Sequence, residues 1–407
     1  MSDRSSMNDP VDKEISLTPG DANAIVSKGE ARTIMREAIT IRNLGPLKDV
    51  TLSEVKPFSV FIGESGSGKS VLLKVLALFR RLPLRLAKAA LLGSAVPNNI
   101  LLLEMLAESD LGYFVKDDTI LEYTATCSDN TQLLFSFKLD QTGIRPADYD
   151  FTGLIPPRSL YIPETRAALP MYLTRGVVQR GEDFGHYFHQ VLNAFLVAIS
   201  CKPVTEIPFL GVNFEYDKSG VSPTYNFVGR SSDQPFTIPY TTGSSGMQSV
   251  TPLLAIVRHF AQRSAQEADI VTENDLALVP PFEVPASRTR LDLHIEEPEL
   301  SLYPSAQCDL IDTLVRQCFV ENKPQVSTSM ATHSPYILNH LNLLIKAHDT
   351  NNTEFTNGAR LDFDNIAAYH VADGGIEDLK MLNHRLVDTN ALSDTIDVIY
   401  NRYEELK

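Results

Sequence analysis

The run Gly63-Glu64-Ser65-Gly66-Ser67-Gly68-Lys69-Ser70 constrains the fold more than any other feature of this sequence. It matches the pattern G-x-x-x-x-G-K-[ST], and it lies between the apolar run 58–62 and the largely apolar segment 70–82. The short run predicts a buried strand, and the longer segment predicts a helix packed against a sheet. The sequence therefore predicts a strand, a glycine-rich loop and a helix in succession, within an α/β fold.

The residue types of this loop suit a polyphosphate. Small residues let successive backbone N–H groups turn toward one centre, and the N-terminus of the following helix adds partial positive charge. Lys69 can then reach the β and γ phosphates, and the Ser70 hydroxyl can ligate Mg²⁺. A glycine-rich turn with an incidental lysine is the alternative, but the flanking strand and helix disfavour it. We expect a nucleotide to be bound by Gly63, Glu64, Ser65, Gly66, Ser67, Gly68, Lys69 and Ser70.

Two neighbouring carboxylates follow a second strand-like run, residues 291–295. Glu296 and Glu297 come directly after it, and Pro298 favours a turn there. A central strand would deliver both side chains beside the phosphate loop. We assign Glu296 to Mg²⁺, through water, and Glu297 to positioning or deprotonating the attacking water. A solvated acidic loop is the alternative, and Glu299 is expected to be solvated surface.

A third strand-like run, residues 326–331, leads to His333. A lone histidine is usually structural, but this one belongs to a third polar cluster at a strand end. That position favours a hydrogen bond from the imidazole to the γ phosphate. His186 and His189 have the spacing of metal ligands, yet nothing near them completes a site. We therefore expect Lys69, Glu297 and His333 to be the catalytic residues.

Charge and composition exclude several classes of protein. With 51 acidic and 36 basic residues the formal charge is -15, which argues against a surface that coats nucleic acid or membrane, so any DNA contact has to be a local patch. No apolar run has the length of a bilayer span and the N-terminus lacks the pattern of a secretion signal, so a soluble cytoplasmic protein is expected. The cysteines form no CxxC pair and are predicted to be reduced, buried thiols. They are Cys127, Cys201, Cys308 and Cys318.

The chain divides into three parts by composition. Residues 1–33 are polar and predict a flexible tail. Residues 34–365 predict one nucleotide-binding head that starts with antiparallel strands near residue 38 and carries a helical insertion at about 84–240, with hairpin-like sequence at 208–236. Residues 366–407 predict a C-terminal helical extension. Sustained heptads are absent, so no long coiled coil is expected.

Together these motifs resemble those of the ABC-type ATPases of the RecF, SMC and OLD group. More narrowly they are similar to the AAA_15-like bacterial ATPases of antiphage defence, such as the ATPase subunits of the Septu and PARIS systems. The resemblance covers about residues 38–407, and it implies an ABC-type ATPase head with a mixed central sheet flanked by helices. Besides the motifs above, it is carried by residues 41–46, 161–166, 243–248, 295–304 and 331–335.

The resemblance also gives a role to a serine-glycine turn that by itself would be an ordinary loop. It makes this turn the signature loop, which contacts the γ phosphate held by the opposite subunit through Ser244, Ser245, Gly246 and Gln248. Pro252 predicts that the helix behind the turn begins near Thr251. Residues 300–303 resemble the D-loop, which lies across the dimer seam, and no residue is assigned to a Q-loop.

In this family two chains sandwich two nucleotides head to tail, so that the ATP state becomes a conformational signal. The expected function is a regulatory or sensor ATPase of a bacterial antiphage defence system. It would use ATP and Mg²⁺, form a homodimer or a higher even-numbered homo-oligomer, and control a separately encoded effector, a nuclease, because residues 334–407 are too few for an OLD-type nuclease domain. The alternative is a RecF-like DNA repair ATPase that binds DNA directly. A transporter subunit ranks last.

Overall fold

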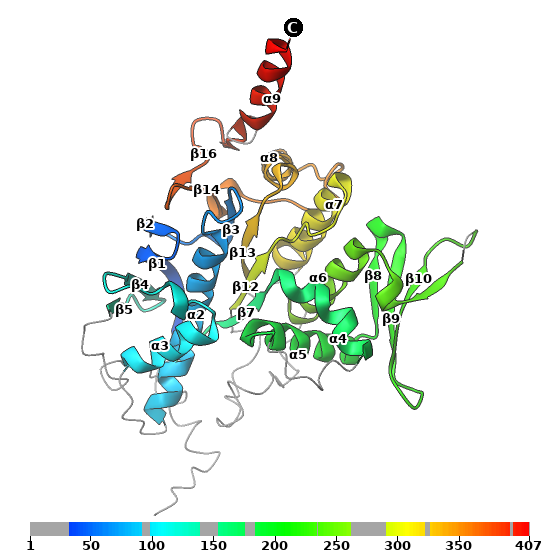
Figure 1. The fold of residues 1–407 in the computed structure, drawn as a ribbon, viewed down its shortest axis with the longest axis horizontal. Coiled ribbons are helices and arrows are strands. Elements are labelled where there is room, and N and C mark those ends of the chain that lie inside the picture. The colour runs from blue at the N-terminus through cyan, green and yellow to red at the C-terminus, as the bar shows by residue number, and fades with distance from the viewer. Residues whose placement is uncertain are drawn as a thin grey trace, which may run out of the picture.

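The computed structural model describes residues 32–91, 98–138, 154–175, 184–233, 235–261, 290–321, 326–390 and 394–406. These residues form a mixed α/β fold, built in layers around a six-stranded sheet (Figure 1). The glycine-rich loop joins strand β3 (Phe58–Ile62) to helix α2 (Lys69–Leu91). The predicted fold class and the predicted strand, loop and helix are therefore confirmed.

The six-stranded sheet has the strand order β15-β14-β3-β13-β12-β7. All its strands run parallel except β15, which pairs antiparallel with β14 at one edge. The strands besides β3 are β7 (Arg158–Ile162), β12 (Leu291–Glu296), β13 (Val326–Thr332), β14 (Ile366–Ala372) and β15 (Gly375–Asp378). Because the carboxyl ends of parallel strands meet at one edge, the segments that follow β3, β7, β12 and β13 gather there.

A mostly antiparallel sheet covers the side of α2 that faces away from the central sheet. Apolar side chains of α2 share one core with both sheets, and the ring of Phe79 stacks on Tyr123 with centroids 5.1 Å apart. This sheet contains β1 (Arg32–Leu44), β2 (Leu47–Leu52), β4 (Ile120–Cys127), β5 (Gln132–Lys138) and β6 (Leu154–Ile155), and it is antiparallel except for the parallel pairing of β6 with β1. The expected N-terminal antiparallel part is thus present. It begins at Arg32, inside the predicted tail, whose residues 1–31 lie outside the described ranges.

Four helices share a second core with the opposite face of the central sheet. Strand β3 serves both cores, because Phe58, Val60 and Ile62 belong to this one and Phe61 to the one around α2. The four helices are α5 (His186–Cys201), α6 (Ser245–Ala261), α7 (Pro304–Val315) and α8 (Pro335–Asp349). The other α-helices in the described part of the chain are α3 (Asn98–Glu108), α4 (Leu169–Arg175) and α9 (Asp394–Glu405), and α9 projects from the body (Figure 1).

The segment predicted as a helical insertion contributes to the central sheet. Its boundary near residue 84 falls inside α2, and β7 pairs in parallel with β12. The segment also contains a second antiparallel sheet of β8 (Val204–Ile207), β9 (Val212–Asp217), β10 (Thr224–Gly229) and β11 (Thr237–Pro239). It is therefore a mixture of helices and strands, with the predicted hairpin sequence in this second sheet.

The prediction of a helical extension over residues 366–407 is wrong for most of that stretch. Strand β14 pairs with β3 in the central sheet, and two short strands, β16 (Lys380–Met381) and β17 (Leu386–Val387), follow β15. The run from Ile366 to Ala372 is held between β3 and β15, and this tertiary pairing outweighs its alanine content. Only α9 is helical.

The cysteines are free thiols. Cys127 and Cys318 are buried as predicted, whereas Cys308 is partly exposed and Cys201 is exposed, so the prediction of buried thiols is wrong for these two. Among the described residues, no helix combines the length and the apolar character needed to cross a bilayer.

Candidate functional site

The motifs singled out in the sequence meet at the carboxyl edge of the central sheet. Strand β13 lies between β3 and β12, so the glycine-rich loop, His333 and the Glu296-Glu297 pair follow three adjacent strands. His333 Nε2 lies 3.5 Å from Glu297 Oε1, and both side chains are partly exposed. The structure therefore brings together the three segments that were expected to form one site.

Lys69 folds back over its own loop. Its Nζ donates hydrogen bonds to the carbonyls of Gly63 at 2.9 Å and Glu64 at 2.7 Å, and the residue is 5% exposed. Burial lowers the pKa of the Lys69 ammonium, and the charges of Glu297 and Glu299 oppose that shift. The lysine is thus held close to the carboxylates that follow β12, although no direct ion pair joins them among the described residues.

The glycine-rich loop presents donors that have no acceptor in the described part of the chain. No group there accepts from the backbone N–H of Ser65, Gly66 or Gly68, and the Ser67 hydroxyl is buried without a partner. Converging donors without acceptors fit phosphate oxygens. Gly68 has φ +107°, and a Cβ on it would lie 2.5 Å from Leu47 Cδ2. Only glycine fits between this loop and the turn that joins β1 to β2.

Glu296 and Glu297 are adjacent but have different surroundings. Glu296 ends β12, is 6% exposed, and its Oε2 accepts from the Glu164 N–H at 3.4 Å. Glu297 has φ +41° and turns its side chain toward His333. A positive φ at a residue other than glycine persists only where the surroundings hold it. The chain therefore turns at Glu297 itself, just before Pro298, and this turn separates the two carboxylates.

The prediction that Glu299 is solvated surface is wrong. Its Oε1 accepts from Thr332 Oγ1 at 2.7 Å and from the His333 N–H at 2.8 Å. The carboxylate thus ties the turn after β12 to the end of β13. It fixes the backbone from which the His333 side chain extends.

Arg166 is a site residue for which sequence reasoning found no role. It is fully buried and donates only to backbone carbonyls. The acceptors are Glu296 at 2.7 Å, Glu297 at 2.5 Å, Pro163 at 3.0 Å and Ser249 at 3.1 Å. Burial lowers the pKa of Arg166 to about 10, against the opposing charges of Glu299, Glu296 and Glu297. The only signal in the sequence was an arginine shortly after an apolar strand, within the 161–166 motif.

Negative charge is in excess at this edge. Burial raises the pKa of the Glu164 carboxyl, and the charges of Glu296 and Glu297 raise it further. The described residues contain no group of three or more His, Cys, Asp or Glu side chains that could hold a metal ion by themselves. Ser70, exposed in the first turn of α2, and Glu296 fit part of the shell of a Mg²⁺ ion whose other ligands are phosphate oxygens and water.

The helix behind the serine-glycine turn begins earlier than predicted. Helix α6 starts at Ser245, so the prediction of a start near Thr251 is wrong, and Pro252 lies inside the helix. Proline has no N–H for the carbonyl four residues before it. The Gln248 carbonyl instead accepts from Tyr240 Oη at 3.0 Å. The buried Tyr240 hydroxyl thus supplies the donor that the helix lacks.

The serine-glycine turn is closed from within and abuts the turn after β12. Gln248 Nε2 donates to the carbonyls of Thr241 at 3.1 Å and Gly243 at 2.8 Å. A Cβ on Gly246 would lie 2.7 Å from the Ser301 carbonyl oxygen, so only glycine permits this approach. The remaining predicted contacts, Ser244 and Ser245, are exposed at the N-terminus of α6, which carries partial positive charge.

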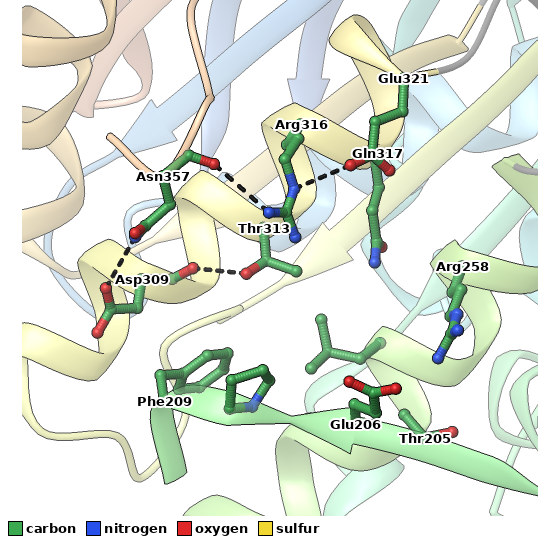
Figure 2. A pocket seen from close by; sticks show the side chains of 12 residues that line it. Thr205, Glu206, Phe209, Arg258, Asp309, Thr313, Arg316, Gln317, Glu321 and Asn357 are labelled. Atoms are coloured by element: carbon green, nitrogen blue, oxygen red, sulfur yellow. Dashed lines mark hydrogen bonds and ion pairs between the residues drawn. The ribbon is translucent and has the colours of Figure 1, made fainter. Parts of the chain in front are cut away.

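A cavity of about 510 Å³ lies elsewhere, between α6, α7 and β8 (Figure 2). Phe209, Arg258 and Thr313 line it, and Arg316 Nε pairs with Glu321 Oε1 at 3.1 Å. None of the predicted site residues lines this cavity. The candidate site is therefore the open edge of the sheet and not this cavity.

Comparison with known proteins found no matching family model and no matching curated protein. Solved structures with some likeness include an SMC head bound to the C-terminal winged-helix domain of ScpA, with a TM-score of 0.37, 11% identity, and 86% of this chain and 98% of that chain covered. The SMC head domain from Thermotoga maritima matches with a TM-score of 0.33 and 10% identity, and the match covers 85% of this chain and 98% of that chain. The recombination mediator protein RecF matches with a TM-score of 0.34 and 10% identity, and the match covers 86% of this chain and 99% of that chain.

Proposed function

We propose that this chain is an ABC-type ATPase that binds ATP on the glycine-rich loop and hydrolyses it at the carboxyl edge of the central sheet. One observation carries the proposal. Free backbone donors and a buried lysine lie on one strand end, while Glu297 and His333 extend from the two neighbouring strand ends. Phosphate binding and water activation need these groups side by side.

Each residue has a separate task in this proposal. The N–H groups of the loop and Lys69 hold the β and γ phosphates, and Glu297 orients the attacking water and takes its proton. His333 donates to the γ phosphate, with Glu297 Oε1 within 3.5 Å of its ring. A Mg²⁺ ion held by Ser70, and through water by Glu296, would polarise the phosphates and balance the excess of carboxylates.

The serine-glycine turn is proposed to complete the site of a second copy of the chain. Ser244 and Ser245 are exposed at a helix N-terminus, which is suited to bind an anion. The turn abuts Ser301, in the stretch that resembles a D-loop. A head-to-tail homodimer, or a larger even-numbered assembly, would place this N-terminus on the γ phosphate held by the partner.

In the cell, we propose that this ATPase is the sensor or regulatory subunit of a bacterial antiphage defence system, acting in the cytoplasm on a separate nuclease effector. The motif resemblance supports this role. The competing role is that of a RecF-like ATPase that binds DNA directly. The formal charge of -15 weighs against it, and DNA binding by the isolated protein that depends on both ATP and salt would favour it.

ATP hydrolysis by Lys69→Ala and by Lys116→Ala tests the site. Lys116 is exposed and lies outside the strand-end cluster, so it is the matched control. We expect the Lys69 variant to lose at least ~100-fold in rate, as for the removal of one preorganised donor. The Lys116 variant should match the parent protein. Equal rates for all three proteins would exclude this site.

A further inference from the structure

We infer that Arg166 is a positioning residue that couples the serine-glycine turn to Glu297 of the same chain, so that phosphate contact by the turn on one side of a dimer sets the hydrolytic geometry on the other. The inference rests on the proposed function. It also identifies a device that no motif of the sequence predicted. Four of the five N–H groups of the buried Arg166 guanidinium donate to backbone carbonyls, so its proposed role is to position other residues and not to bind a nucleotide.

The first step is the link from α6 to Arg166. Ser245 begins the helix, and one turn later the Ser249 carbonyl accepts from Arg166 Nε at 3.1 Å. Any displacement of the first turn of α6 therefore moves an acceptor of a buried, planar guanidinium. Because that group is rigid, its other donors have to follow.

The second step is the link from Arg166 to Glu297. Nη1 donates to the Glu296 carbonyl at 2.7 Å, and Nη2 donates to the Glu297 carbonyl at 2.5 Å. The Glu297 N–H is held on its other side by the Ala331 carbonyl at 2.8 Å. Glu297 has φ +41°, which is unfavourable unless both sides of the residue are fixed. The Glu297 carbonyl also accepts from the Leu300 N–H at 3.0 Å, so weakening the bond to Arg166 removes one of its two restraints and loosens the residue that carries the proposed base.

Pro252 allows the start of α6 to shift, because it removes one hydrogen bond within the helix. Pro252 gives no N–H to the Gln248 carbonyl, and the Tyr240 hydroxyl replaces that donor at 3.0 Å. Burial raises the pKa of Tyr240 well above its usual value, so the hydroxyl stays protonated and donates. The first turn of α6 is therefore bonded to side chains from other segments as well as to its own helix.

A second contact between α6 and the turn after β12 provides an internal comparison. Ser249 Oγ donates to the Leu300 carbonyl at 2.7 Å, which bypasses Arg166. If this contact carried the coupling, Ser249→Ala would abolish it and Arg166→Lys would not. The geometry favours Arg166 because it holds the carbonyls of Glu296 and Glu297 directly. Ser249 Oγ reaches Glu297 only through Leu300, whose N–H also donates to the Glu297 carbonyl at 3.0 Å.

The test measures ATP hydrolysis against ATP concentration for the parent protein and for Arg166→Lys, Pro252→Ala, Ser249→Ala and Arg258→Lys. Arg258 lies on the same helix but lines the separate cavity, so it is the matched control. Alanine is preferred to proline inside a helix, so Pro252→Ala keeps the fold, and its new N–H competes with Tyr240 for the Gln248 carbonyl. Thermal unfolding of each variant checks that it is folded.

We expect cooperative hydrolysis by the parent protein, with a Hill coefficient above 1. In Arg166→Lys and Pro252→Ala the coefficient falls to about 1, the maximal rate falls ~10-fold and nucleotide affinity stays within ~3-fold, since the lost contact orients the base and does not bind the nucleotide. Ser249→Ala and Arg258→Lys should remain cooperative. A parent that hydrolyses ATP without cooperativity, or cooperativity kept in folded Pro252→Ala, would overturn the coupling alone. Loss of the proposed function would show separately, as hydrolysis that does not depend on Lys69.

Discussion

The charged residues around the two ends of strand β12 differ in whether they are paired. At its amino end the charges are buried and paired with one another. Glu37 accepts from Arg80 Nη2 at 2.9 Å, from Arg290 Nη2 at 2.7 Å and from Tyr123 Oη at 2.7 Å. Arg290 Nε also pairs with Asp292 Oδ1 at 2.8 Å. Burial by itself would raise the pKa of Glu37, but the two guanidinium groups hold it well below its usual range.

At its carboxyl end the same strand delivers carboxylates that have no such partners. Glu296 and Glu297 converge with Glu164, and the nearest guanidinium, that of Arg166, uses its donors on backbone carbonyls. Buried charges that satisfy each other hold a fold together, whereas an excess of one sign has to be met by a ligand. The amino end is therefore expected to determine stability and the carboxyl end activity.

The largest effect is expected at the carboxyl end. Glu297→Gln removes the proposed base, so hydrolysis should fall at least ~100-fold while nucleotide binding is kept. Because ATP then stays in place, an ATP-dependent dimer should accumulate, which light scattering would detect. The midpoint of thermal unfolding should not fall. A rate within ~10-fold of the parent protein would contradict the role of Glu297.

The second largest effect is expected at the amino end, on stability and not on activity. Glu37→Ala leaves two buried guanidinium groups with one carboxylate, which should lower the free energy of unfolding by ~3–5 kcal/mol. Urea unfolding measures this, with Glu122→Ala on exposed β4 as the control. The rate of hydrolysis per folded molecule should stay within about twofold of the parent. A loss of stability no larger than that of the control would show that the amino end is not a stabilising network.

A smaller effect concerns the pH dependence of stability. Burial, and then the charge of Arg80, holds the pKa of His294 well below its usual value, so the native imidazole stays neutral. The unfolded chain takes up a proton below about pH 6.5, and the free energy of unfolding then falls by up to ~1.4 kcal/mol per pH unit. Urea unfolding between pH 7 and pH 5 should show a shallower slope for His294→Gln than for the exposed control His384→Gln. Equal slopes would count against a buried neutral imidazole.

The smallest effect returns to the carboxyl end. The raised pKa of Glu164 means that its ionised form is disfavoured in the native state. Glu164→Gln should therefore raise the free energy of unfolding, by ~0.5 kcal/mol or less because the residue is exposed and solvent screens its charge. The gain should be present at pH 8 and vanish as the pH falls through the raised pKa of the native carboxyl. Destabilisation at pH 8 would contradict an excess of negative charge.

The sequence predicted the elements that carry local patterns. The apolar run 58–62 and the helix after it were found because the glycine-rich loop marks their boundary. The strands before Glu296 and His333 were predicted because each run contains apolar residues typical of a strand and is followed by polar residues. Since parallel strands end at one edge, the convergence of these residues also followed from the pattern.

The sequence did not predict contacts whose partners lie far apart in the chain. Nothing local shows that Arg166 serves carbonyls of Ser249 and Glu297, or that Tyr240 replaces the donor that Pro252 lacks. Glu299 looked solvated because its acceptor role depends on the adjacent strand β13. In each case a buried backbone or side-chain group is satisfied by tertiary contacts, which local periodicity does not contain.

Hydrolysis by a mixture of two inactive variants tests the shared site most directly. Lys69→Ala removes the phosphate lysine, and Ser245→Asp places a negative charge at the start of α6, where an acidic residue is compatible with the helix but repels a phosphate. A mixed dimer would contain one site with both defects and one intact site. If each site combines the loop of one chain with the serine turn of its partner, mixing should restore activity, to about a quarter of the parent rate if the two sites act independently and to about tenfold less if Arg166 couples them. If the site lies within one chain, the mixture should stay as inactive as either variant alone.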